Sequence, residues 1–383
     1  MHTMTEPIYL DHNATTPIAP EVLEAMLPWL REHHGNPSSS HAYGRRAARA
    51  VDTARAQVAQ LIGAQPDEVV FTGCATEANN LALLGVAREV GPSRRRLVIS
   101  AVEHPAVTAP AKFLREQGWK VTVVPVDEFG RISVEALEQA LTAEPALVSV
   151  MHANNEVGTL QEIREIARLA RQRGILLHSD AAQSAGKLPL NVHDLGVDLL
   201  TLAGHKFNAP KGVGALFVRP GTPVRSITHG ADQEHGLRPG TENVALIVAL
   251  GAAATLAHAS LPGITTQLQS LRDRLHAKLQ AGVPGLRLNG HPDQRLPNTL
   301  HVSFPGVSGR SLLAEASDAV AASVGSACHS EQDAVSGVLA AMGFDAERAR
   351  GAVRLSVGRT TQVADIDRAA EALTAAWERL TMR

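Results

Sequence analysis

The chain has 383 residues, 44% of them hydrophobic and 19% charged, which is enough apolar material for a large core and predicts two or three domains. A net charge of -2 gives no general electrostatic case for nucleic acid or an anionic membrane as partner. Only two cysteines occur, so we expect no disulfide framework and a cytoplasmic, reducing location.

No targeting or membrane segment is predicted. Residues 1–7 lack the basic stretch followed by an apolar one that a signal peptide needs. The longest mostly apolar run, residues 244–257, is too short for a membrane helix and predicts a buried core helix.

Strand-like runs alternate with amphipathic helical stretches through the first two-thirds of the chain. We predict strands at residues 69–72, 97–100, 121–124, 147–151, 175–178, 197–203 and 213–218. Helices are predicted between several of them, at residues 47–61, 133–141 and 163–173. This alternation predicts an α/β fold with a mostly parallel central sheet.

The pattern changes after the helix at residues 244–257. Leu261, Pro262 and Gly263 predict a break, and a second helix is predicted at residues 265–280. Strands at 300–304 and 353–357 and a helix at 364–380 complete the chain. We interpret residues 16–258 as a large domain, and residues 1–15 with 259–383 as a smaller α+β domain.

Lys206 and Asp180 are the most informative pair. Asp180 falls just beyond the carboxyl end of the predicted strand 175–178, and Lys206 follows the strand 197–203 in a Gly-His-Lys turn. Ligands gather at the carboxyl ends of parallel strands. A lysine can form a Schiff base with an aldehyde, and an aspartate can hold a protonated pyridine nitrogen, so the pair suggests pyridoxal phosphate. The alternative is a surface lysine and a helix-capping aspartate, which two matching strand ends disfavour.

Residues 71–80 predict a strand, a turn of small residues and the start of a helix. Backbone N–H groups at a helix N-terminus bind phosphate, so Ala75 and Thr76 become candidate phosphate ligands. His205 is a further candidate donor. An ordinary capped helix is the alternative interpretation.

Over nearly its whole length the chain resembles the NifS/IscS-type cysteine desulfurases and the related selenocysteine lyases, which are class V, fold-type I pyridoxal-phosphate enzymes. The motifs that carry the resemblance are residues 9–16, 35–39, 75–77, 103–104, 154–158, 180–183, 204–206, 238–243, 325–328 and 354–359.

The resemblance implies a role for individual residues at the cofactor. Lys206 is expected to bind the cofactor covalently and to move the substrate α-proton, and Asp180 to pair with its pyridine nitrogen. His104 is expected to stack on the ring and to serve as a proton shuttle, although a helix-capping role is its alternative. Gln183 is expected to contact the phenolic oxygen, and Asn155 the cofactor or the substrate carboxylate.

The remaining expected contacts concern phosphate and substrate. Ala75, Thr76 and His205 are expected to hold the phosphate, and Thr241 to reach the phosphate of a neighbouring subunit, which implies a homodimer with shared sites. Arg354, with Asn155 and Asn13, is expected to bind the substrate, because the guanidinium fork suits a carboxylate. No metal site is predicted.

Cys328 lies in a stretch of small and polar residues, 323–330, rather than among the large apolar residues that usually surround a structural cysteine. Its thiolate is a candidate nucleophile. The resemblance implies that it attacks the chalcogen of L-cysteine or L-selenocysteine, keeps it as a persulfide or selenopersulfide, and releases alanine. A sulfur or selenium acceptor protein is a possible further partner. Cys74, by contrast, is expected to pack beneath the phosphate turn.

The chain departs from the usual desulfurase pattern at Ala203, Gly73-Cys74, Asn208-Ala209 and His235. The stretches 199–204, 322–330 and 353–361 are more similar to the selenocysteine lyases and favour selenocysteine as substrate. The alternatives are a cysteine desulfurase that supplies iron-sulfur cluster or thio-cofactor assembly, a class V aminotransferase, and a non-catalytic sulfur-carrier or assembly scaffold.

Overall fold

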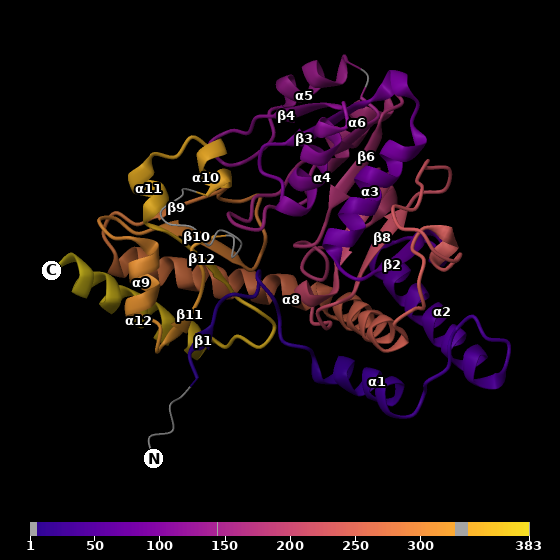
Figure 1. The fold of residues 1–383 in the computed structure, drawn as a ribbon. Helices are drawn as coiled ribbons and strands as arrows, with labels where there is room; N and C mark the ends of the chain where they lie inside the picture. The colour runs from indigo at the N-terminus through magenta and orange to yellow at the C-terminus, as the bar shows by residue number, and fades with distance from the viewer. Residues whose placement is uncertain (1–5, 144, 326–335, 383) are drawn as a thin grey trace.

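The computed structural model describes residues 6–143, 145–325 and 336–382. Within these residues, a seven-stranded sheet has the order β2-β8-β7-β6-β5-β3-β4. Only β8 runs antiparallel to its neighbours, so the predicted α/β fold with a mostly parallel sheet is confirmed (Figure 1). The strands are β2 (Val69–Thr72), β3 (Arg96–Ser100), β4 (Lys120–Val124), β5 (Leu147–Ser149), β6 (Leu176–Asp180), β7 (Leu199–Ala203) and β8 (Gly214–Val218).

Helices cover both faces of this sheet, because successive side chains of a strand point to opposite faces. Val70 and Leu97 pack into one apolar core with α3 and α4, whereas Phe71 and Val98 pack into another with α1, α2, α5, α6 and α7. The helices are α1 (Pro20–Arg31), α2 (Ala42–Ile62), α3 (Ala75–Glu89), α4 (Pro105–Glu116), α5 (Val134–Leu141), α6 (Ile163–Arg171) and α7 (Val192–Leu195). Short 3₁₀ turns are η1 (Pro66–Glu68), η2 (Pro92–Arg94), η3 (Gly204–Lys206) and η4 (Glu234–Gly236).

A separate apolar core lies between the C-terminal strands and helices. The antiparallel strands β12 (Ala352–Ser356), β10 (Thr299–Ser303) and β9 (Arg287–Leu288) form one sheet, and β1 (Ile8–Tyr9) pairs with β11 (Val320–Ala321). The helices here are α9 (Gly309–Glu315), α10 (Gly337–Ala341), α11 (Ala346–Arg350) and α12 (Val363–Thr381). This separate core supports our proposal of a small domain made of residues 1–15 and 259–383.

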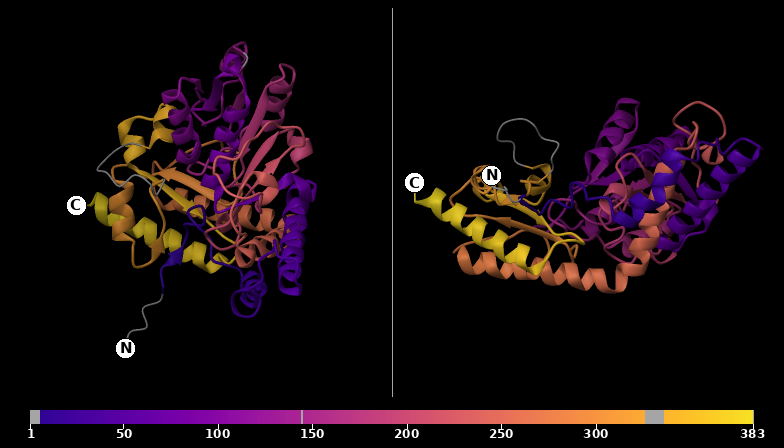
Figure 2. Two further views of the ribbon diagram at one scale, coloured as in Figure 1. Left: turned by 45° about the vertical axis from the view of Figure 1, so that its right-hand side comes forward. Right: turned by 90° about the horizontal axis from the view of Figure 1, so that it is seen from below.

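The predicted break at residues 261–263 is wrong, because α8 (Val244–Gly282) continues through Pro262 as one helix (Figure 2). Its first half packs with α1 and α2 and its second half with α12, so tertiary packing outweighs the cost of an interior proline. By length and composition alone, α8 also passes as a membrane span, but the core helix of a soluble protein passes the same test.

Candidate active site

The carboxyl ends of β6 and β7 open into a cavity of ≈ 280 Å³. Strand β6 delivers Asp180 to its wall, and β7 leads through Ala203 into the 3₁₀ turn that carries Lys206. The predicted site residues that line this cavity are Asn13, Ala75, Thr76, His104, Asn155, Asp180, Gln183, His205, Lys206 and Arg354.

Asp180 is 5% exposed, and both of its carboxylate oxygens accept hydrogen bonds. Oδ2 accepts from Nδ2 of Asn79 at 2.7 Å and Oδ1 from the backbone N–H of Ala182 at 2.9 Å. These donors fix the carboxylate at the cavity wall. The sequence analysis did not predict Asn79 as a site residue. A polar residue on the otherwise apolar, buried face of helix α3 is the sequence feature that could have indicated it.

The Nζ of Lys206 donates to the carbonyl oxygens of Asn13 at 2.5 Å and Ala14 at 2.8 Å. The chain segment around Asn13 therefore forms the wall beside Lys206, although it lies 193 residues away in sequence. Both of these acceptors are backbone carbonyls, so they place the amine at the cavity wall.

The N-terminus of α3 meets the cavity at Ala75 and Thr76. Its N-cap residue, Cys74, makes no side-chain capping hydrogen bond, so the first turn of the helix still needs an acceptor. The expectation that Cys74 packs beneath this turn is wrong. The residue is exposed and lines the cavity, because its backbone is fully extended where the helix begins.

His104 is the N-cap residue of α4, and its Nδ1 accepts from the backbone N–H of Ala106 at 3.1 Å. His104 therefore both caps helix α4 and lines the cavity. Because Nδ1 is an acceptor, the ring carries its proton on Nε2. Burial lowers the pKa of His104 against the opposing effect of Asp180, which favours a neutral imidazole.

His205 lies between the Lys206 turn and the N-terminal segment. Its Nδ1 is 3.2 Å from Oγ1 of Thr15, and its carbonyl oxygen accepts from Thr16. Burial, and then the charge of Lys206, lowers the pKa of His205 to about 4, so that the ring is neutral at pH 7. It can donate or accept a hydrogen bond at the cavity wall, but it brings no positive charge.

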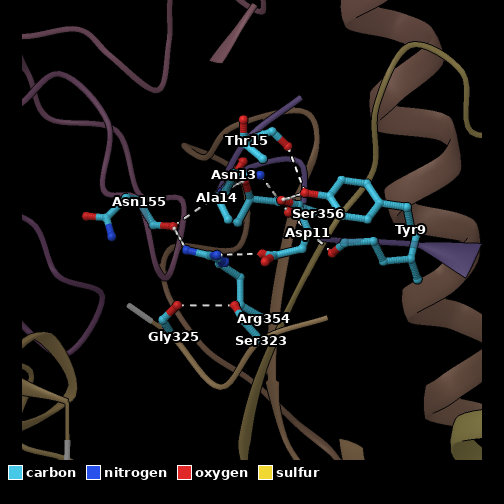
Figure 3. Close-up of polar contacts among 12 residues, drawn as sticks. Tyr9, Asp11, Asn13, Ala14, Thr15, Asn155, Ser323, Gly325, Arg354 and Ser356 are labelled. Carbon is cyan, nitrogen blue, oxygen red and sulfur yellow. Dashed lines mark hydrogen bonds and ion pairs between the residues drawn. The ribbon is translucent and has the colours of Figure 1, made fainter. Parts of the chain in front are cut away.

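Arg354, on β12, is 2% exposed and is held by two partners (Figure 3). One guanidinium nitrogen donates to the Asp11 carboxylate at 2.6 Å and another to the carbonyl oxygen of Asn155 at 3.0 Å. Its Nε has no hydrogen-bond partner among the described residues. Asn13 is fixed nearby, because its Nδ2 donates to Oγ1 of Thr299 at 2.8 Å. A buried cation that lines the cavity suits an anionic ligand.

Thr241 is exposed and lies outside this cavity, beside a second hollow of ≈ 270 Å³ that Glu242 and Arg238 also line. One oxygen of Glu242 is buried there without a partner among the described residues. An exposed position outside its own cavity is what Thr241 would need if it contacted the phosphate in the site of another subunit.

Cys328 lies outside the described residues, but the residues that flank its segment converge on one side chain. Oγ of Ser336 donates to Oε2 of Glu156 at 2.5 Å. A Cβ added at Gly325 would lie 3.0 Å from the same oxygen. Glu156 follows Asn155, and Ser323 pairs with Arg354 through backbone hydrogen bonds. Gly325 and Ser336, the described residues on either side of that segment, therefore both lie beside Glu156, the neighbour of the cavity-lining Asn155.

The residues present fit pyridoxal phosphate. The open N-terminus of α3 offers N–H groups to a phosphate, the buried Asp180 offers a carboxylate to a ring nitrogen, and Lys206 offers an amine. All three line one cavity. Among the described residues, no group of three or more His, Cys, Asp or Glu side chains is arranged to hold a metal ion.

Comparisons with known proteins give a consistent result. The family model for aminotransferase class-V matches residues 8–369. Cysteine desulfurase 2 of Trichormus variabilis is 44% identical over 374 residues, which cover 97% of this chain and 94% of that protein. A solved NifS-like protein has a TM-score of 0.91 at 36% identity and covers 98% of this chain and 100% of its own. SspA, solved in complex with cysteine, has a TM-score of 0.81 at 35% identity over 92% of this chain and 99% of its own.

Proposed function

The chain belongs to the aminotransferase class-V family of pyridoxal-phosphate enzymes and has cysteine desulfurases as relatives, and from this we propose that it removes the sulfur of L-cysteine to give L-alanine. One observation carries the proposal. The buried Asp180, the amine of Lys206 and the guanidinium of Arg354 line the same cavity. Together they can hold a pyridine ring, an aldehyde and an amino-acid carboxylate.

The cofactor, when bound, supplies an electron sink for the carbanion at the substrate α-carbon. We assign the phosphate to the α3 N-terminus at Ala75 and Thr76 with His205, and the ring nitrogen to Asp180. Gln183 would donate a hydrogen bond to the phenolic oxygen, and His104 would lie against the ring. These assignments rest on the cavity-lining positions of the residues and on the family resemblance.

Arg354 binds the substrate carboxylate, with Asn155 and Asn13 beside it. Lys206 then takes the α-proton of the substrate, and the neutral ring of His104 exchanges a proton at the substrate thiol through Nε2. The lowered pKa of His104 favours the neutral ring, and because Nδ1 accepts from Ala106, Nε2 carries the proton that the ring can give up and take back at the substrate sulfur.

Cys328 is the proposed nucleophile. Its thiolate attacks the substrate sulfur, a sulfur–sulfur bond forms, and the bond between the substrate β-carbon and its sulfur breaks. The electron pair of that bond remains with the carbon fragment, which is protonated and leaves as alanine. A thiolate of an acceptor protein then attacks the outer sulfur of this persulfide, the sulfur–sulfur bond to Cys328 breaks, and Cys328 leaves as a thiolate.

The substrate preference is a finer question. The three stretches near Ala203, Cys328 and Arg354 favour selenocysteine, whereas the relatives reported above are cysteine desulfurases or bind cysteine. A selenol ionises more readily than a thiol, so we propose that a site that processes cysteine also accepts selenocysteine. Because the relatives are cysteine desulfurases or bind cysteine, we propose that cysteine is the main substrate. Alanine formation from each amino acid, followed by a competition between them, tests this. Turnover of selenocysteine alone would overturn it.

We also propose a homodimer in which Thr241 serves the phosphate of the partner subunit, and a cytoplasmic location. The exposed position of Thr241, outside its own cavity, supports the first. The low cysteine content supports the second.

The decisive experiment is the Cys328→Ala variant loaded with pyridoxal phosphate. We expect the absorption band of the bound cofactor to remain and alanine formation from cysteine to be lost. Undiminished alanine formation would refute the role of Cys328. Undiminished transamination with a keto acid in the same variant would instead favour an aminotransferase.

A further inference from the structure

A second lysine, Lys187, is buried behind the candidate active site. It is 6% exposed and lies on the turn after β6, the turn that also carries Gln183. The segment from Gln183 to Lys187 is a turn that passes through Gly186 at a positive φ of 73°, and the backbone N–H of Lys187 donates to the carbonyl oxygen of Ser184 within it. The Nζ of Lys187 donates to the carbonyl oxygen of Gln183 at 3.0 Å and to its Oε1 at 3.2 Å.

Burial of this amine is unfavourable for the stability of the fold. Burial, followed by the charges of Lys206 and Arg354, lowers the pKa of Lys187 to about 7. Its two hydrogen-bond acceptors, both on Gln183, are neutral, so they offset the cost of a buried cation only in part. An apolar side chain of similar volume would avoid this cost, so a role at the site explains the lysine better than stability does.

The position of Lys187 determines which way the amide of Gln183 faces. The Lys187 amine has hydrogens to donate whether it is charged or neutral, and the amide of Gln183 turns its acceptor oxygen toward Nζ. Nε2 of Gln183 then faces the other side and donates to the carbonyl oxygen of Asn13 at 3.1 Å. That carbonyl also accepts from Lys206. Nε2 has two hydrogens, so one remains for a ligand in the cavity that Gln183 lines.

Lys187 itself does not line the main cavity. It lines a small hollow of ≈ 40 Å³, which Lys206 and His12 also line. His12 is 3% exposed, and its Nδ1 has no partner among the described residues. Lys206 thus lines both spaces, and Lys187 makes its hydrogen-bond contact with the wall of the large cavity through Gln183.

We propose that Lys187 is a positioning residue that holds the Gln183 amide with its N–H groups toward the cofactor. The inference rests on the proposed assignment of Gln183 to the phenolic oxygen. It does not depend on which chalcogen the enzyme removes.

The test is a pH titration of the absorption band of the cofactor-loaded enzyme. The proton that titrates lies between the phenolic oxygen and the nitrogen of Lys206 that links it to the cofactor. Without a hydrogen-bond donor from Gln183, the phenolic oxygen carries more negative charge and holds this proton more tightly. The pH midpoint of the absorption band should therefore rise. We expect a rise of about one pH unit in Lys187→Met and a similar rise in Gln183→Met. The double variant should rise no further than either single variant, because both changes remove one interaction.

Lys112→Met makes the same chemical change on the exposed face of α4 and should leave the midpoint unchanged. If Lys187→Met does not fold, Lys187→Gln takes its place in the cycle with the same criteria. An unshifted midpoint in the Lys187 variant, or additive shifts in the double variant, would overturn the inference. Alanine formation by the unsubstituted enzyme tests the proposed function separately.

Discussion

Arg354 is the residue whose surroundings most restrict substitution. Its guanidinium is held by Asp11 and the Asn155 carbonyl, with Nε unpartnered among the described residues. We expect Arg354→Lys to raise the KM for cysteine about ten- to a hundredfold and to change kcat less, because lysine cannot supply the planar fork. Steady-state alanine formation measures both constants. Arg310→Lys, at an exposed position, is the control, and an unchanged KM in Arg354→Lys would contradict the assignment.

Cys74 offers a second test at the residue scale. Because this thiol is exposed at the cavity wall beside the α3 N-terminus, a thiol reagent should modify it in the cofactor-free enzyme. Bound pyridoxal phosphate should slow the reaction severalfold by covering that turn. The measurement needs the Cys328→Ala background, in which Cys74 is the one remaining cysteine. Equal rates with and without cofactor would place the phosphate elsewhere.

The sequence predicted the residues that line the cavity better than it predicted their partners. Asp180 and Lys206 were predictable because each follows a recognisable strand. The contact between Lys206 and the carbonyl oxygen of Asn13 could not be predicted, because every residue has a backbone carbonyl and the residue type does not indicate which one is used. Lys187 was missed for a related reason. A lysine between glycine and leucine in a turn is usually exposed, and only the tertiary structure shows its burial.

At the scale of elements, a buried ion pair fastens the turn η4 to helix α2. Nη1 and Nη2 of Arg55 each donate to the Glu234 carboxylate at 2.7 Å, and the backbone N–H of Phe71 donates to the same carboxylate. Glu234 and His235 have positive φ angles of 50° and 58°, which non-glycine residues rarely adopt. The ion pair therefore holds a strained turn in place.

We expect Arg55→Met to lower the free energy of unfolding by about 3–5 kcal/mol, because it leaves the Glu234 carboxylate buried and unpaired. Urea denaturation measures the change. Adding Glu234→Gln should recover part of the loss, and Arg168→Met, which breaks an exposed pair on α6, should have little effect. A loss in Arg55→Met no larger than that of the exposed control would refute the argument.

Helix α8 shows where local sequence signals mislead. Leu-Pro-Gly is a strong chain-breaking sequence, yet the helix continues through it because separate cores hold its two halves. The strands of the central sheet were predicted to within a few residues, since short apolar runs between polar turns are a local property. Packing between distant elements is not a local property, and so the length of α8 could not be predicted.

At the scale of the whole molecule, buried histidines should make the fold acid-sensitive. Burial lowers the pKa of His178 to about 4 and that of His301 to about 3. The unfolded chain binds their protons near pH 6.5, so the stabilisation is present above that pH and is lost as the pH falls toward 4 and 3. Burial raises the pKa of Glu103 to about 8, which opposes this trend, but His12 and His152 add to the histidine effect.

We expect the free energy of unfolding to fall between pH 6.5 and 4, with a contribution on the order of 3 kcal/mol at most from His178. Urea denaturation at pH 7, 6 and 5 measures the slope. His178→Gln should flatten it, whereas His193→Gln at an exposed position should not. A free energy independent of pH in this range would contradict the role of the buried histidines.

The segment around Asn13 has a consequence for synthesis on the ribosome. The backbone N–H of Asn13 donates to Oγ of Ser356, 343 residues later, and its side chain bonds to Thr299. The proposed large domain, residues 16–258, can begin to collapse as it emerges, since domains fold as units during translation. The wall of the cavity beside Lys206 must wait until residue 356 has left the exit tunnel. A nascent chain therefore cannot complete its cofactor pocket, and a ribosome stalled before that point should carry a chain that binds pyridoxal phosphate poorly.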